Sequence, residues 1–189
     1  MKKILVTLIA TIIFALPAIA ALGVGAAAPK FSAKASLDGK AFDYSLSEAL
    51  DEGTVVVYFY PSAYTRGCNI QAHEFAEKME QFNAAGASVI GVSLDSIERL
   101  NDFSADPEFC AGKLAVASDE SGDIARTFDL SVRGAKEGAE DSRGVEIGHG
   151  FAERMTFIVT SDGKIAEAIG GVSPLENVEK SLETVRRLQ

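Results

Sequence analysis

A continuous run of β-branched and aromatic residues restricts the fold of this chain more than any other feature. The run is Thr54-Val55-Val56-Val57-Tyr58-Phe59-Tyr60. It shows no alternation of apolar and polar side chains, which predicts a strand buried on both faces. Pro61 follows and cannot donate to a sheet ladder, so the strand should end there. A strand of this kind needs a packed layer on each side.

The remaining segments can supply those layers. The pattern predicts a mixed sheet flanked by helices, an α/β architecture whose element order is compatible with a thioredoxin-like fold. Residues 131–150 carry many charges and glycines and are predicted to form a long loop. The predicted hairpin turns are at 36–40 and 161–163, further strands are at 88–93, 114–117, 155–159 and 164–168, and helices are at 45–50, 68–86, from Asp95 or Ser96 to 103, at 122–128 and at 174–187.

The first residues resemble a secretory leader. Two lysines precede an apolar run from Ile4 to about Ala21, and Ala18-Ile19-Ala20 provides a small-residue cleavage site. We expect residues 1–20 to be a signal peptide and residues 21–189 to be one periplasmic domain. The alternative is an uncleaved membrane anchor, since the run is nearly long enough to span a bilayer. Pro17 just before the cleavage site favours the signal peptide.

The acidic net charge argues against polyanionic partners. The formal net charge is −9, and loss of Lys2 and Lys3 with the leader would make it −11. Such a surface repels a phosphate backbone and an anionic membrane, so we expect neither nucleic-acid binding nor stable membrane association after cleavage.

The chain has two cysteines, Cys68 and Cys110. Cys68 follows the predicted buried strand and lies in the first turn of the next helix. Unpaired N–H groups and a partial positive charge at a helix N-terminus favour a thiolate over a thiol. Ligand sites of open α/β sheets also lie at the carboxyl ends of strands. This position nominates Cys68 as a nucleophile, and an inert buried cysteine is the alternative.

The sequence around Cys68 resembles one known family. Pro61-x-x-x-Thr65-x-x-Cys68 is the signature of the peroxiredoxins, and three further segments occur in that family's order: the 25–31 opening, Val92-Ser93-Leu94-Asp95, and Arg154-Met155-Thr156-Phe157. The resemblance therefore covers nearly the whole chain after the leader. It is greatest to the alkyl hydroperoxide reductase/thiol-specific antioxidant family, on the side of the bacterioferritin-comigratory-protein group, and it implies a thioredoxin-like fold.

The resemblance also implies a function and a set of site residues. The protein would be an antioxidant thiol-dependent peroxidase that reduces hydrogen peroxide and organic hydroperoxides. Cys68 would attack the hydroperoxide and become a sulfenic acid. Thr65 would hydrogen-bond the peroxide, Arg154 would stabilise the thiolate and orient the substrate, and Pro61 would shield the sulfur from water. Fixed donors aimed at a developing negative charge suit this reaction.

The sequence departs from some relatives in how the sulfenic acid would be reduced. His73 stands where some members of this group carry a second, resolving cysteine, so we expect it to be a helix-surface residue. Cys110 matches the region of another resolving cysteine, although not by motif. Cys110 is therefore one candidate for the resolving role, and an external thiol is the alternative. The reductant would be a thiol or a thioredoxin-like protein.

Two other functional hypotheses have less support. A non-peroxidatic thiol-disulfide oxidoreductase of the thioredoxin type needs a C-x-x-C pair, and Gln71 stands at the position of the second cysteine. Gln71 lies one turn after Cys68, and we expect it only to cover the helix surface. A non-enzymatic interaction module would not need Thr65, Cys68 and Arg154 together. The two histidines have no accompanying ligand set, so we propose no metal site and no cofactor. Both a monomer and a dimer are compatible with the sequence.

Overall fold

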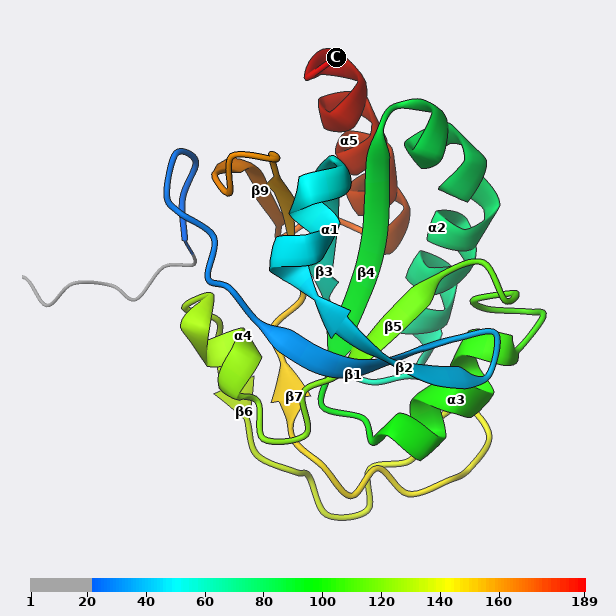
Figure 1. Ribbon diagram of the computed structural model, residues 1–189. Coiled ribbons are helices and arrows are strands. Elements are labelled where there is room, and N and C mark those ends of the chain that lie inside the picture. Colours follow the sequence, from blue (N-terminus) through cyan, green and yellow to red (C-terminus); the bar gives the residue numbers. More distant parts are fainter. Residues whose placement is uncertain (1–21) are drawn as a thin grey trace, which may run out of the picture.

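A seven-stranded mixed sheet forms the centre of the protein. The computed structural model describes residues 22–189, so the predicted signal peptide lies outside the described residues. The strand order is β2-β1-β5-β4-β3-β8-β9 (Figure 1). Strand β3 (Thr54–Phe59) pairs in parallel with β4 (Ala87–Ser93) and antiparallel with β8 (Met155–Val159). The predicted run is therefore an internal strand of the sheet.

The other elements also follow the predicted order. β9 extends two residues beyond its predicted end at 168, and α3 begins after Ser96 rather than Asp95. The remaining strands are β1 (Ser32–Leu37), β2 (Lys40–Ser45), β5 (Ala115–Ser118), β6 (Val132–Arg133), β7 (Phe151–Ala152) and β9 (Ile165–Gly170). The helices are α1 (Leu46–Glu52), α2 (Arg66–Ala84), α3 (Ile97–Ala105), α4 (Asp123–Thr127) and α5 (Pro174–Arg187).

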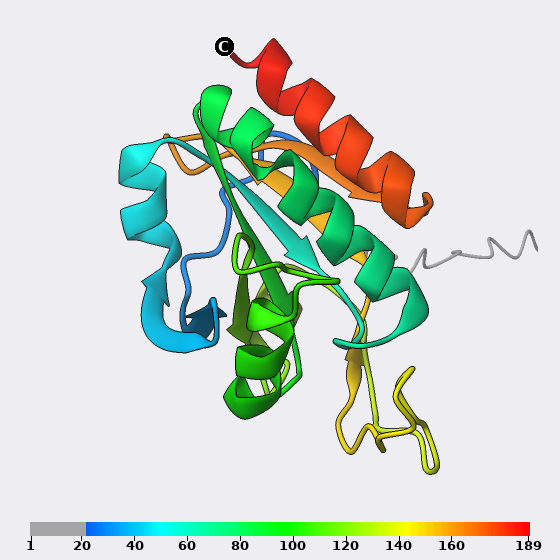
Figure 2. The ribbon, with the colours of Figure 1, turned by 90° about the vertical axis from the view of Figure 1, so that its right-hand side faces the viewer.

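Two hydrophobic clusters cover the two faces of the sheet. Val56 and Tyr58 of β3 belong to the cluster that includes buried side chains of α2, α3 and α5. Val55, Val57 and Phe59 belong to the opposite cluster, with buried side chains of α1 and α4. Figure 2 shows α2 and α5 side by side over one face. The prediction that this strand is buried on both faces is confirmed.

Three of the helices begin with a serine cap. Ser45, Ser96 and Ser173 each accept a hydrogen bond from the backbone N–H three residues later, which satisfies one donor of the first helical turn. Pro174 then occupies the first position of α5, where a missing N–H costs nothing.

The long loop predicted at 131–150 is closed at its base by a short ribbon. Strands β6 and β7 pair antiparallel, with Val132 opposite Ala152 and Arg133 opposite Phe151. A single bridge joins Glu140 to Glu146 within the loop. Figure 2 shows the segment between β6 and β7 projecting at the end of the molecule where α2 begins.

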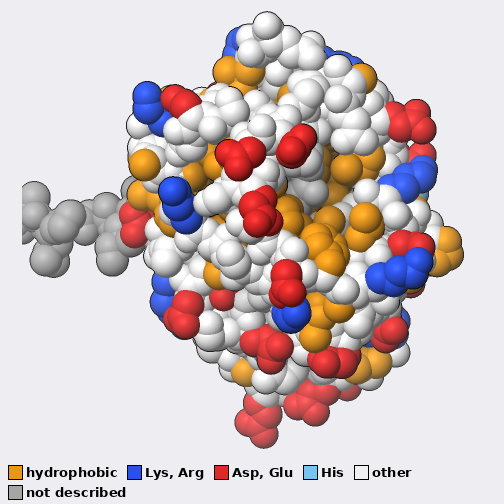
Figure 3. Space-filling view, in the orientation of Figure 1, with side chains coloured by type: hydrophobic (Ala, Val, Ile, Leu, Met, Phe, Trp, Pro, Cys, Tyr) orange, Lys and Arg blue, Asp and Glu red, His pale blue; other side chains and the backbone are white. Residues whose placement is uncertain are grey.

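The surface agrees with the acidic composition. On the face seen in Figure 3, Asp and Glu side chains are spread over the surface with Lys and Arg scattered among them. Within residues 22–189, no helix has the length and hydropathy needed to cross a membrane.

Packing beneath α2 gives a first prediction. A Cβ added at Gly91 in β4 would lie 2.6 Å from Cζ of the buried Tyr58 ring, so Gly91→Ala should destabilise the protein by about 1–3 kcal/mol through overpacking. Denaturant unfolding measures the change. Gly134→Ala is the matched control, because a Cβ there meets nothing within 4 Å. Equal stabilities of the two variants would contradict this packing.

Candidate active site

Cys68 lies in the first turn of α2, as predicted. β3 ends at Phe59, and the chain then passes through a short loop to Thr65, the N-cap of α2. The Cys68 side chain is buried, with 2% of the residue exposed. The amides of the first helical turn carry a partial positive charge, which favours the thiolate.

Arg154 lies directly beside the sulfur. Its Nη2 donates to Cys68 Sγ at 3.2 Å. The topology explains the contact: Met155 pairs with Phe59 across β8 and β3, so Arg154 lies at the end of β3 from which the Cys68 loop departs. Gly67 leaves room for the guanidinium, since a Cβ at that position would be 3.3 Å from Nη2. The predicted meeting of Cys68 with Arg154 is therefore observed.

A buried polar network holds Arg154 in place. Its Nη1 donates to Gln71 Oε1, and Gln71 Nε2 donates to Asn177 Oδ1 at 3.0 Å. The same oxygen accepts from Thr156 Oγ1 at 2.7 Å, and Asn177 Nδ2 donates to the Ile169 carbonyl at 3.1 Å. The side-chain oxygen and the side-chain nitrogen of both Gln71 and Asn177 therefore have hydrogen-bond partners.

Gln71 is a correction to the sequence analysis. It is fully buried rather than a residue that covers the helix surface. Its position three residues after Cys68 places the two side chains on one helix face, a signal that could have identified it. Asn177 lies on α5, and no local pattern links it to the site.

The loop before Cys68 places Thr65 and Pro61. Thr65 is half-buried, and its hydroxyl donates to the Ser62 carbonyl at 2.8 Å instead of capping α2. Its oxygen lone pairs therefore have no helix amide as a partner. Pro61 is half-buried directly after the strand. Both residues belong to the loop that delivers Cys68.

Asp95 fixes this loop through hydrogen bonds to Ser62 and Ala63. Its buried carboxylate accepts from Ser62 Oγ at 2.9 Å, the Ala63 amide at 2.8 Å, Ser93 Oγ at 2.7 Å and His149 Nε2 at 2.9 Å. Burial alone would raise the pKa of Asp95, but the hydrogen bond and charge of His149 lower it below its usual value. Conversely, burial opposes a charge on His149, and Asp95 nevertheless raises the pKa of that imidazole.

Of the polar residues His149 and Glu146, which precede Arg154 in the long loop, only His149 contacts the loop before Cys68, and Glu146 is exposed.

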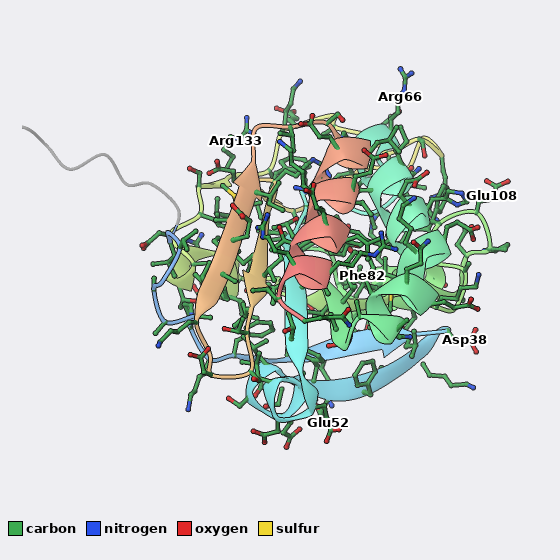
Figure 4. All side chains as sticks on the ribbon, turned by 90° about the horizontal axis from the view of Figure 1, so that it is seen from above. Asp38, Glu52, Arg66, Phe82, Glu108 and Arg133 are labelled. Atoms are coloured by element: carbon green, nitrogen blue, oxygen red, sulfur yellow. The ribbon has the colours of Figure 1, made fainter. Side chains whose placement is uncertain are left out.

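The other polar residues near the motif lie on the protein surface. Arg66 is exposed, and Figure 4 shows its side chain pointing away from the body of the protein. His73 is exposed on α2, as predicted, with Nδ1 3.1 Å from the Glu108 carbonyl oxygen. Among residues 22–189, no three His, Cys, Asp or Glu side chains are grouped to hold a metal ion.

Cys110 lies in the turn after α3 and is fully buried as a free thiol, in the same hydrophobic cluster as Cys68. Burial, and then the charge of Asp106, raise the pKa of Cys110. Burial also raises the pKa of Tyr58, and the charges of Cys110 and Cys68 raise it further, whereas the charge of Arg154 lowers it. Phe109 packs edge-on against Tyr64, with ring centroids 5.6 Å apart.

Comparison with known proteins identifies the family. Residues 24–168 match the family model described as AhpC/TSA family. The chain belongs to the AhpC/TSA family. Peroxiredoxin Bcp of Escherichia coli K12 is 33% identical over 144 residues, which are 76% of this chain and 83% of that relative. A putative peroxiredoxin of Mycobacterium tuberculosis H37Rv is 29% identical over 146 residues, which are 76% and 85% of the two chains.

Solved structures of peroxiredoxins are also similar to this chain. Peroxidoxin BcpB from Mycobacterium tuberculosis superposes with a TM-score of 0.74 at 26% identity, covering 89% of this chain and 99% of that one. The bacterioferritin comigratory protein of Xanthomonas campestris gives a TM-score of 0.64 at 26% identity, covering 82% and 90%. This peroxiredoxin therefore belongs to the Bcp-like group, has a thioredoxin-like fold and is a thiol-dependent peroxidase. It reduces a hydroperoxide and uses a thiol as the reductant.

Proposed function

We propose that Cys68 is the residue that this peroxidase oxidises. The contact that carries the proposal is the 3.2 Å hydrogen bond from Arg154 Nη2 to Cys68 Sγ at the start of α2. The thiolate attacks the terminal oxygen of the hydroperoxide. An S–O bond forms and the O–O bond breaks, so the sulfur is oxidised to a sulfenic acid. The alkoxide or hydroxide leaves and becomes an alcohol or water by taking up a proton.

The surrounding residues have separate roles in this proposal. The guanidinium of Arg154 stabilises the thiolate and the negative charge that develops on the peroxide oxygens. Gln71 is a positioning residue that keeps the guanidinium directed at the sulfur. Thr65 donates its own proton to Ser62, so its oxygen can accept a hydrogen bond from the peroxide O–H. Pro61 limits access of water to the sulfur.

Arg154→Met tests the proposed site. Loss of the fixed cation should slow the oxidation of Cys68 by about a hundredfold or more, the effect of removing a donor from a developing charge. The second-order rate with hydrogen peroxide measures it. Arg66→Met is the matched control, because Arg66 is an exposed arginine in the same helical turn as Cys68. Cys68→Ser should have no peroxidase activity, and retained activity would refute the assignment.

We further propose that Cys110 resolves the sulfenic acid. The thiolate of Cys110 attacks the Cys68 sulfur, an S–S bond forms, the S–O bond breaks, and hydroxide leaves and is protonated to water. Both cysteines belong to one hydrophobic cluster, which supports this role. Because both thiols are buried, the two segments must open locally before the disulfide can form. The alternative is direct reduction of Cys68 by an external thiol.

Replacing Cys110 distinguishes these mechanisms. Cys110→Ser should eliminate the loss of two mass units that follows one equivalent of peroxide, and Cys68 should overoxidise to sulfinic acid at lower peroxide concentration. Intact-protein and peptide mass spectrometry measure both effects. Cys110→Ala, which keeps the site apolar, should behave in the same way. If the wild-type protein gives no Cys68–Cys110 cross-linked peptide, an external thiol resolves Cys68.

We also propose that residues 1–20 direct the protein to the periplasm and are then removed. The lysines, the apolar run and the A-x-A site support this proposal. The reductant would then be a thiol or thioredoxin-like protein of that compartment. The mature chain should begin at Ala21 and fractionate with soluble periplasmic proteins, as N-terminal sequencing can establish. An intact N-terminus in the membrane fraction would instead identify an anchor.

A further inference from the structure

Both ring nitrogens of His149 face hydrogen-bond acceptors. Nδ1 lies 2.7 Å from the Gly150 carbonyl oxygen, and Nε2 lies 2.9 Å from Oδ1 of Asp95. A neutral imidazole has a single N–H, so it can donate to only one of these oxygens and presents a lone pair to the other. The imidazolium donates to both. The contacts of His149 therefore match its protonated form.

Charged groups on several segments surround this imidazole. Asp95 follows β4, and Arg99 belongs to α3. Glu120, after β5, and Glu146, in the long loop, line the same surface hollow as His149. Burial opposes a charge on His149, but the hydrogen bond and the charge of Asp95 outweigh it and raise the pKa, whereas the charge of Arg99 lowers it. Because 20% of its side chain is exposed, His149 can exchange its proton with solvent.

His149 is linked to the site through Asp95 and Ser62. Ser62 Oγ donates to the same Asp95 oxygen at 2.9 Å and lies 3.4 Å from His149 Nε2. The Ser62 carbonyl in turn accepts from the Thr65 hydroxyl at 2.8 Å. In the proposed mechanism, Thr65 uses its oxygen lone pairs to accept from the peroxide O–H, and the bond to Ser62 sets their direction. The position of Ser62 therefore connects His149 to the substrate.

We propose that His149 is a positioning residue that must be protonated for the full rate of Cys68 oxidation by hydroperoxide. When the imidazole loses its proton, it gives up a hydrogen bond either to Asp95 or to the backbone carbonyl. Ser62 is then held less firmly, and the Thr65 hydroxyl is no longer fixed toward the peroxide. His149 neither touches the peroxide nor transfers a proton to it. The proposal rests on the proposed roles of Cys68 and Thr65, and it concerns only the step with peroxide, so it holds whichever thiol later reduces the sulfenic acid.

The ionisations of Cys68 and His149 act on the rate in opposite directions. Ionisation of the Cys68 thiol increases as the pH rises and accelerates attack on the peroxide, because the thiolate is the nucleophile. Loss of the His149 proton also increases with pH, but it slows the attack. Since the pKa of His149 is raised, its contribution to folding is complete below the usual histidine pKa and is lost as the pH rises through the raised value. We expect the rate per thiolate to fall over the same interval.

His149→Gln tests the proposal in the full-length protein. The glutamine side chain carries no charge and has one nitrogen, so it cannot make both hydrogen bonds of the imidazolium. The second-order rate with hydrogen peroxide is measured from about pH 5 to about pH 9 and divided by the fraction of Cys68 thiolate, taken from ultraviolet absorbance. In the wild-type protein this ratio should fall about tenfold as the pH rises, which corresponds to the loss of one charge-assisted hydrogen bond. The variant should have the low ratio throughout, without the fall.

His73→Gln is the matched control, because His73 is the only other histidine of the chain and is exposed on α2. It should keep the wild-type pH profile. Proton NMR follows the imidazoles directly, and the imidazole signal that is missing in His149→Gln belongs to His149. Its titration midpoint in the wild-type protein should coincide with the midpoint of the fall in rate per thiolate.

A double variant tests the route through Thr65. Thr65→Val already lacks the acceptor for the peroxide O–H, so adding His149→Gln should slow the reaction by less than about twofold more. A further loss as large as the one in the wild-type background would contradict this route.

Three other outcomes would overturn the proposal: a wild-type rate per thiolate that does not fall, a fall that persists in His149→Gln, or an imidazole midpoint that differs from the midpoint of the fall. The comparison of the two midpoints needs only the wild-type rates and the assignment of one NMR signal, so it decides the matter even if His149→Gln is less stable. Failure of the underlying assignment has a separate signature, because Cys68→Ser would then retain peroxidase activity.

Discussion

β3 lies between two hydrophobic layers, and its side chains from Val55 to Phe59 all pack in one layer or the other. Reactive groups can therefore be placed only where the strand ends. The chain leaves the sheet at Pro61, and the next helix begins a few residues later with Cys68 in its first turn. Because β8 runs antiparallel to β3, its first residue meets the last residue of β3. Arg154, just before β8, is thereby brought to the thiol. One buried strand thus fixes both partners of the central contact.

A buried polar group without a partner is costly, so the orientation of Arg154 depends on the groups that pair with it. Arg154 is paired with the thiol on one side and with Gln71 on the other. Gln71 in turn is held by Asn177 of α5, which also receives the hydroxyl of Thr156. The orientation of the guanidinium therefore depends on the packing of α5 against α2, far from the motif that contains Cys68.

These dependences explain what the sequence could predict. The unbroken apolar run identifies β3 as an internal strand, and the serines before helices mark three of the helix starts, because both signals are local. The motif and its downstream arginine are sufficient to predict the meeting of Cys68 with Arg154. The spacing of Gln71 from Cys68 places both side chains on one face of α2, whereas the role of Gln71 follows only from its contacts with Arg154 and Asn177. The contacts of Asn177 with Gln71 and of Ser142 with the Tyr64 carbonyl join distant segments, so no sequence pattern indicates them.

The buried carboxylates of Asp95 and Asp141 show how the long loop becomes part of the site. Arg99, near the start of α3, donates through Nε to Asp95 and through Nη2 to Asp141. Asp95 accepts hydrogen bonds from Ser62 Oγ and the Ala63 amide, whereas Asp141 accepts one from the Arg143 amide in the long loop. Nη2 of Arg99 also donates to the Ala63 carbonyl at 3.0 Å. One guanidinium therefore joins the loop before Cys68 to the long loop between β6 and β7. Since each carboxylate is buried and charged, removing either would leave Arg99 partly unpaired, and the two segments would lose their common support.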